Sequence, residues 1–155
     1  MKKLLVTFLS VIMVMVFMPT MAFAANDNVA KIGDKEYATL AAAVEEAEDG
    51  DTIELLNDTT ANDIRLTKSL TFNLNGKTIT GTSDATRVFL VQNKTVSATF
   101  NGGVIEVTNV AGDGLGIATQ GGKLELNDME IRVAAPDTTA LYNYGIRISA
   151  YNTAG

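Results

Sequence analysis

The strongest constraint on the fold of this chain is an internal repeat of 26 residues. Three turn signals recur at that spacing: Asn75-Gly76, Asn101-Gly102 and Asn127-Asp128. An isoleucine follows each of them at the same distance, namely Ile79, Ile105 and Ile131. Three copies of one pattern at a fixed period are typical of proteins built from stacked structural units. The asparagines of stacked units can then hydrogen-bond to one another as a ladder.

Within each repeat, apolar and polar residues alternate. A shift of 26 residues aligns three mostly apolar columns, which are Leu70, Val96 and Gly122; Phe72, Ala98 and Leu124; and Leu74, Phe100 and Leu126. Alternation with period two is the mark of a β-strand with one buried face. Further strands are expected at 87–91, around 115–118 and at 144–148. Three short strands and three turns per repeat predict one coil of a parallel β-helix, so the expected fold class is all-β.

The alternative is an antiparallel arrangement. Asn-Gly is the strongest short turn signal, and it would fold residues 70–80 into a β-hairpin around Asn75-Gly76. Several such hairpins would give a sandwich or a meander. We favour the β-helix, because a hairpin does not require the whole pattern of buried and exposed positions to recur at constant length.

The segment before the repeats predicts a cap. Residues 29–37 are expected to form one or two short strands around a turn at Gly33-Asp34. Thr39 can accept a backbone N–H from the first turn of a helix, and Gly50 can adopt the left-handed conformation that ends one. One apolar stripe recurs between them at helical spacing, made of Leu40, Ala43, Val44 and Ala47. The first coil of a solenoid needs its apolar end covered, so this helix is the expected cap.

The N-terminus has the order of a secretory signal peptide. Two lysines precede an apolar run from Leu4 to Met18, and Ala22-Phe23-Ala24 matches a cleavage site. The run is shorter than the roughly 20 residues that cross a bilayer, so we expect cleavage rather than anchoring. The predicted organisation is a signal peptide at 1–24, N-terminal strands and a capping helix at 25–51, and β-helix coils at 52–155.

Composition narrows the partners and the chemistry. The net charge is −6, and it becomes −8 when Lys2 and Lys3 leave with the signal peptide. An acidic surface repels phosphates, so we expect neither nucleic acid nor, after signal cleavage, a membrane as partner. The chain has no cysteine and no histidine, which excludes disulfides, thiolate metal sites and histidine-based catalytic triads. The expected location is extracellular, either secreted or associated with the cell wall.

Four stretches carry a family resemblance: Tyr37-Ala38-Thr39-Leu40, Ala43-Val44-Glu45-Glu46-Ala47, Gly50-Asp51-Thr52-Ile53-Glu54-Leu55 and Leu74-Asn75-Gly76-Lys77-Thr78-Ile79. With them the chain resembles the opening of right-handed parallel β-helix proteins of the pectin-lyase-like type. Many such openings belong to secreted or surface proteins of Gram-positive bacteria. The resemblance implies a right-handed solenoid with a capping helix. It implies no particular chemistry, because function lies in sites carried on a fold.

No catalytic motif of those families is matched, so we assign no catalytic, cofactor-binding or metal-binding residue. The candidates for glycan contact or acid/base chemistry are outward-facing polar residues: Glu106, Asp128, Glu130 and Arg132. Glu106 is expected one coil below Arg132. Glycoside hydrolases need two carboxylates roughly 5 to 10 Å apart, and neighbouring coils meet that distance in many places. A solvated surface is the simpler interpretation of these charges.

Two further groups of residues are weaker candidates for a site. Asn109, Asp113 and Asp128 could supply oxygen ligands to calcium, which needs six to eight of them. The chain lacks the spacing of an EF-hand loop, and Gly112-Asp113-Gly114 is explained as a turn, so no cofactor is expected. Tyr142, Tyr144 and Tyr151 could stack on sugars, but packing against a further coil is the simpler explanation for them.

The leading functional hypothesis is a non-catalytic extracellular β-helix module for surface display, adhesion or glycan contact. The expected partner is an extracellular polysaccharide or another cell-surface molecule. The alternative is a polysaccharide lyase or glycoside hydrolase that acts on extracellular polysaccharide. The alternating pattern runs to the last residues without a terminal cap. We therefore expect either an N-terminal part of a longer protein or an end covered by a partner.

Overall fold

The computed structural model describes residues 27–82, 87–108, 114–133 and 143–149. They form the helix α1 (Leu40–Glu46) and the strands β1 (Ala30–Ile32), β2 (Lys35–Tyr37), β3 (Thr52–Leu55), β4 (Thr59–Thr60), β5 (Ile64–Leu66), β6 (Leu70–Asn73), β7 (Thr78–Gly81), β8 (Arg87–Val91), β9 (Ser97–Val107), β10 (Gly114–Gln120), β11 (Lys123–Val133) and β12 (Asn143–Ser149). The predicted signal peptide at 1–24 lies outside the described residues.

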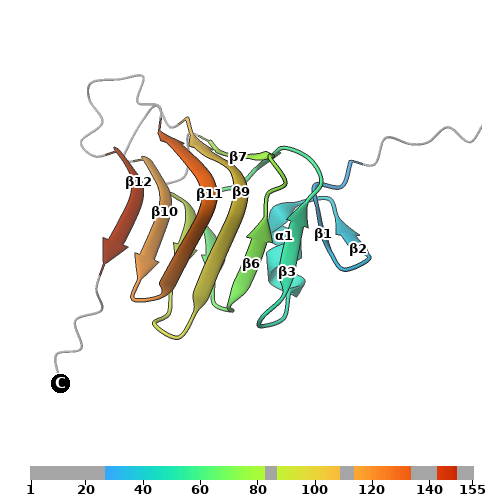
Figure 1. Ribbon diagram of the computed structural model, residues 1–155, viewed down its shortest axis with the longest axis horizontal. Coiled ribbons are helices and arrows are strands. Elements are labelled where there is room, and N and C mark those ends of the chain that lie inside the picture. The colour runs from blue at the N-terminus through green and yellow to red at the C-terminus, as the bar shows by residue number, and fades with distance from the viewer. Residues whose placement is uncertain (1–26, 83–86, 109–113, 134–142, 150–155) are drawn as a thin grey trace, which may run out of the picture.

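The strands form two sheets (Figure 1). The larger has the order β2-β1-β3-β6-β9-β7-β4, with β11 also paired to β9, and the smaller has the order β12-β10-β8-β5. Strand β1 pairs antiparallel with β2 and β3, so the larger sheet is mixed. The other pairings between described strands are parallel. The predicted all-β class with one short helix is confirmed.

The register of the parallel strands corrects the predicted alignment of the first two repeats. Strands β9 and β11 pair with an offset of 26 residues, as in Ile105 opposite Ile131, and β7 and β9 share that offset. Strands β6 and β9 pair with an offset of 28, which places Phe72 opposite Phe100. The predicted alignments of Leu70 with Val96, Phe72 with Ala98 and Leu74 with Phe100 are therefore wrong. The offset of 28 arises because the connection between β6 and β7 is two residues longer than the corresponding bend inside β9.

The hairpin interpretation of residues 70–80 is wrong. Strands β6 and β7 both pair in parallel with β9, in two successive stretches of that long strand. Asn75 and Gly76 occupy the turn between them with φ angles of 52° and 75°. This turn bends the chain within the larger sheet and does not reverse it onto itself.

Inward-facing side chains of both sheets meet in one hydrophobic core. Phe72 and Phe100 stack with ring centroids 4.7 Å apart. Phe89 of the smaller sheet meets both rings at 5.4 and 4.9 Å. All three side chains are fully buried, and each aromatic pair adds roughly 0.5–1.5 kcal/mol beyond the burial of its area. The two sheets are therefore held together by aromatic contacts that the 28-residue offset creates.

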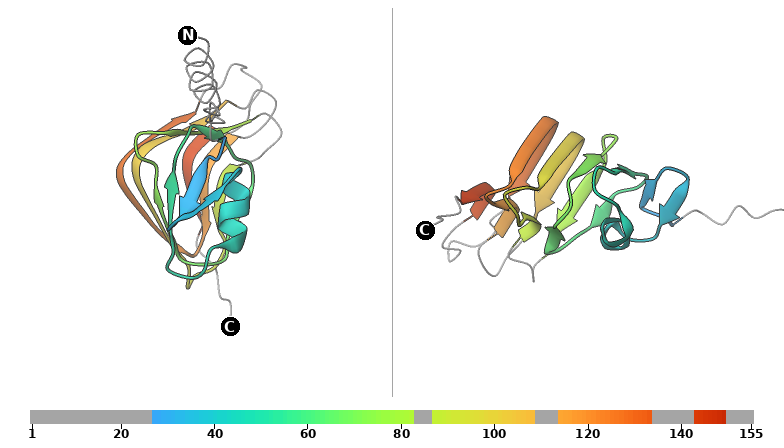
Figure 2. Two further views of the ribbon diagram at one scale, coloured as in Figure 1. Left: turned by 90° about the vertical axis from the view of Figure 1, so that its right-hand side faces the viewer. Right: turned by 90° about the horizontal axis from the view of Figure 1, so that it is seen from below.

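Helix α1 begins where the sequence predicts, but it ends earlier than predicted. The prediction that Gly50 ends the helix is wrong, because the C-cap is Ala47 and Gly50 lies in the turn before β3. The Thr39 hydroxyl accepts a hydrogen bond from the Ala42 N–H at 3.1 Å, and the N-cap backbone is extended, as capping requires. Leu40, Ala43 and Val44 are buried in the core. The helix lies beside β1, β2 and β5 at the N-terminal end of the stack (Figure 2). In the described part of the chain, no helix is long and apolar enough to cross a membrane.

An asparagine ladder crosses three strands of the larger sheet. Asn127 donates to the side-chain oxygen of Asn101 at 2.9 Å, and Asn101 donates to that of Asn73 at 2.8 Å. The predicted ladder is confirmed, but its first member is Asn73. Asn75 instead donates to the Leu55 carbonyl at 3.2 Å. The amides thus hold β6, β9 and β11 in one register.

Candidate functional site

The four predicted site residues lie in two neighbouring strands of the larger sheet. Arg132 of β11 is the parallel neighbour of Glu106 in β9, as the repeat predicts. Glu130 precedes Arg132 by two positions and so shares its face of the strand. Asp128 lies at the bend of β11 with a φ angle of 53°. The structure therefore brings Glu106, Glu130 and Arg132 together and leaves Asp128 at a turn.

Arg132 is paired within its own strand. Its Nε and Nη2 donate to the two carboxylate oxygens of Glu130, both at 2.7 Å. This two-pronged hydrogen bond lowers the pKa of Glu130 and raises the pKa of Arg132, while Glu106 adds only a weaker attraction to the guanidinium. A carboxylate with a lowered pKa stays ionised at neutral pH. Glu130 is therefore poorly suited to donate a proton as a general acid.

The calcium hypothesis finds no support in the described residues. Asn109 and Asp113 lie outside them, and Asp128 is the only one of the three proposed ligands that the structure places. Among the residues that are described, no three acidic side chains gather in a way that could hold a metal ion. Of the three tyrosines, Tyr142 and Tyr151 also lie outside the described residues, and the backbone of Tyr144 pairs with Leu115 in the smaller sheet.

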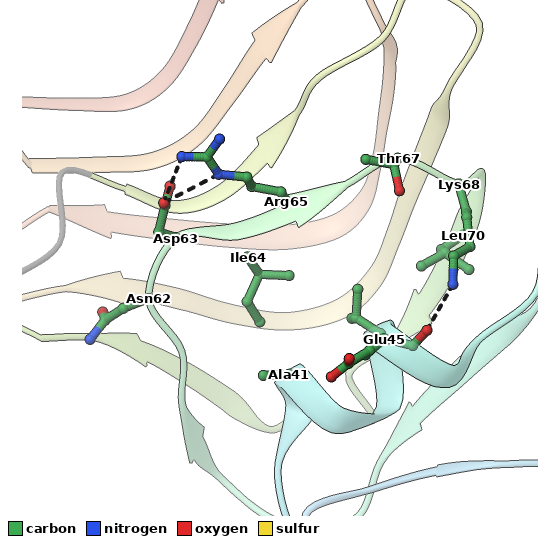
Figure 3. A pocket seen from close by; sticks show the side chains of 10 residues that line it. Ala41, Glu45, Asn62, Asp63, Ile64, Arg65, Thr67, Lys68 and Leu70 are labelled. Atoms are coloured by element: carbon green, nitrogen blue, oxygen red, sulfur yellow. Dashed lines mark hydrogen bonds and ion pairs between the residues drawn. The ribbon is translucent and has the colours of Figure 1, made fainter.

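A groove of about 390 Å³ lies between α1 and β5 (Figure 3). Sequence reasoning missed this hollow. Its apolar lining consists of the buried Val44, Ile64 and Leu70 and the exposed Ala41. Its polar lining consists of Glu45, Asn62, Asp63, Arg65, Thr67 and Lys68. The groove is thus amphipathic, with an aliphatic base and charges of both signs around it.

Asp63 fixes the end of the groove nearest β8. One carboxylate oxygen accepts from Nε of Arg87 at 2.7 Å, and the other accepts from Nη2 of Arg65 at 3.2 Å. Asp63 also has a φ of 49°, in the left-handed region that aspartate tolerates better than most residues. The carboxylate therefore holds the Arg65 guanidinium at the rim, while the side chain of Arg65 remains 54% exposed.

Lys68 fixes the opposite end. Its ammonium donates to the Glu45 carbonyl at 2.9 Å and also to the Ala47 carbonyl. These carbonyls belong to the last turn of α1 and its C-cap, where a cation offsets the negative end of the helix dipole. Close by, the Ser69 N–H donates to the Asp49 carboxylate at 2.7 Å. These contacts tie the helix to the segment between β5 and β6, so both walls of the groove are anchored.

The groove was not visible in the sequence for a clear reason. Lys68 and the helix carbonyl that it binds are 23 residues apart, and neither Arg65 nor Glu45 belongs to a recognisable motif. The signal available in the sequence for this groove was a pair of basic residues, Arg65 and Lys68, after a helix whose exposed face is acidic. That signal is common on protein surfaces and does not identify a site.

Comparisons with known proteins leave the family of this chain open. No family model matches the sequence. A search of curated proteins and a search of solved structures likewise found no match.

Proposed function

We propose that this chain is a non-catalytic module of a right-handed parallel β-helix, of the pectin-lyase-like type, exported from a bacterium by the signal peptide at 1–24. Its role is surface display or adhesion through contact with an extracellular glycan. The proposal treats the mature chain as a rigid scaffold whose outer side chains meet the partner.

The observation that carries this proposal is the parallel register. From β7 onward the strands alternate between the larger and the smaller sheet. Each of β9, β10, β11 and β12 pairs in parallel with an earlier strand of its own sheet, for example β11 with β9 and β10 with β8. This is the connectivity that a coil-by-coil solenoid requires. The same register puts like residues side by side on the outside, for example Thr71 beside Thr99. Such rows suit a partner that is itself a repeating polymer.

The electrostatics of the outer surface support a non-catalytic role. Glu130 is held ionised by Arg132, which lowers the pKa of its carboxyl group, and the pKa of Glu125 is lowered by a hydrogen bond from Lys123. Glycoside hydrolysis needs one carboxyl group with a raised pKa to protonate the leaving oxygen. Arg132 and Lys123 instead lower the pKa of Glu130 and Glu125. These two carboxylates therefore serve better as hydrogen-bond acceptors than as acids.

Glycan-array binding and a turnover assay test the proposal together. We expect the purified protein to bind at least one class of extracellular polysaccharide, acidic or neutral, and to release no product from it. Turnover that is abolished by Asp128→Asn or Glu130→Gln would establish an enzyme and contradict the non-catalytic role. Failure to bind any glycan on the array would contradict glycan contact.

A further inference from the structure

We infer that the groove between α1 and β5 is a subsite for one neutral pyranose ring of an extracellular polysaccharide. The inference rests on the proposed function for the general class of ligand. It adds the place of binding, the kind of sugar and the residues that recognise it, and it concerns residues other than the four outward-facing candidates on β9 and β11.

The floor of the groove matches the apolar face of a sugar ring. Ile64 points from β5 toward Ala41 on the helix (Figure 3). Leu70 is 3% exposed, so the base of the groove is continuous with the hydrophobic core. A pyranose carries C–H groups on one face and hydroxyls around its edge. An aliphatic base with polar side chains around it is complementary to that shape.

The rim offers both donors and acceptors. Arg65 uses Nε and Nη2 on Asp63, and within the described residues its Nη1 has no hydrogen-bond partner. The Glu45 carboxylate and the Thr67 hydroxyl are likewise without a partner among the described residues, and both side chains are exposed. A sugar hydroxyl can accept from a guanidinium and donate to a carboxylate. The rim can therefore satisfy the edge of a ring from two sides.

The charge balance favours a neutral ring over an anionic one. Asp63 is committed to two arginines, and Lys68 is committed to the end of the helix. Among the described residues, the charged atoms of the lining left for a ligand are Nη1 of Arg65 and the carboxylate of Glu45. The whole chain carries a net charge of −6, which disfavours a polyanion approaching over its surface.

The volume and openness of the site set its affinity. About 390 Å³ accommodates one ring of a chain that continues over the surface, and it lies at the lower end of the range of ligand pockets, roughly 300–1,000 Å³. The site lacks an aromatic platform, because none of its lining residues is aromatic. We therefore expect a dissociation constant on the order of 1 mM for a short oligosaccharide.

Titration of the purified protein with defined oligosaccharides tests the inference. The neutral probes are cello-, xylo- and chito-oligosaccharides, and the acidic probe is oligogalacturonate. Glu45→Gln and Arg65→Gln should each weaken binding of the neutral ligand about tenfold, since each removes a charged hydrogen-bond partner. Ala41→Phe fills the groove from the exposed side of the helix and should abolish binding. Matched controls are Ala42→Phe and Glu48→Gln, which lie on or just after α1 outside the groove and should leave binding unchanged.

The outcomes separate the inference from the function on which it rests. Binding of a neutral oligosaccharide that Ala41→Phe abolishes, with Ala42→Phe unaffected and both proteins folded by circular dichroism, is the expected result. Binding that survives Ala41→Phe and Glu45→Gln overturns the groove assignment while leaving glycan contact standing. Binding of oligogalacturonate alone overturns the neutral specificity. The absence of binding to every probe, both here and on the array, contradicts the proposed function as well.

Discussion

Replacing Phe72 with alanine is expected to lower the free energy of unfolding by about 3–5 kcal/mol. The side chain is fully buried, and it touches one aromatic ring from each sheet, Phe100 at 4.7 Å and Phe89 at 5.4 Å. Its removal leaves a cavity at the point where the two sheets meet. Because small domains are stable by only about 5–15 kcal/mol, a loss of this size brings the protein close to unfolding at room temperature.

Urea denaturation followed by circular dichroism measures the effect. Thr71→Ala is the matched control, since Thr71 neighbours Phe72 in β6 but is not part of the core. It should change the free energy of unfolding by less than about 0.5 kcal/mol. Equal effects of the two substitutions would mean that the aromatic cluster does not form.

The second large effect is expected from Gly103→Ala. A Cβ at this position would lie 2.4 Å from the Leu74 Cβ and 2.7 Å from the Lys77 carbonyl oxygen. Both contacts are shorter than real Cβ atoms tolerate, and one involves backbone, so the turn between β6 and β7 must move. We expect a loss of about 1–3 kcal/mol in the free energy of unfolding, the usual cost of overpacking.

Gly102→Asn supplies the control for that substitution. Gly102 has a φ of 57°, and a Cβ added there would meet no atom within 4 Å. Asparagine tolerates the left-handed conformation better than most residues. Gly102→Asn should therefore lower the stability of the protein less than Gly103→Ala does. Thermal unfolding of both variants measures the difference. A larger loss of stability from Gly102→Asn than from Gly103→Ala would contradict the close approach of the β6–β7 turn to β9.

Local patterns in the sequence were sufficient to predict several elements, although not the end of α1 or the continuity of β9 and β11. The Thr39 cap, the buried stripe of α1 and strand β8 at 87–91 all lie where the sequence predicts them. Each depends on residues close together in the chain, such as a hydroxyl three residues from the N–H that it accepts. The 26-residue offset between β9 and β11 was also predictable, because Asn101 and Ile105 recur as Asn127 and Ile131 at that spacing.

The 28-residue offset between β6 and β9 was not predictable from alternation. A shift of one residue would turn every inward side chain outward, but a shift of two preserves the pattern of buried and exposed positions. The repeated Asn-Gly pairs then favoured the wrong choice, by aligning Asn75 with Asn101. Only the longer connection between β6 and β7, visible in three dimensions, makes Asn73 the partner of Asn101.

The candidate site was harder to predict than the fold. The pairing of Glu106 with Arg132 followed from the repeat, but the tighter bond between Glu130 and Arg132 depends on side-chain rotamers within one strand. The α1–β5 groove depends on how the helix docks against β5. That docking is fixed by Lys68, through contacts between distant segments that no local pattern encodes.

The central claim is the parallel register of neighbouring strands, on which the aromatic core and the proposed function both depend. Pairs of introduced cysteines test it directly, because the chain has no cysteine of its own. Thr71 and Thr99 are parallel neighbours, so their Cα atoms lie about 4.8 Å apart, within the range of a disulfide. Under mild oxidation, Thr71→Cys with Thr99→Cys should form an intramolecular disulfide, whereas Thr71→Cys with Ser97→Cys, the pair expected from a 26-residue offset, should not. A disulfide between cysteines at positions 71 and 80, as a hairpin would require, would contradict the account.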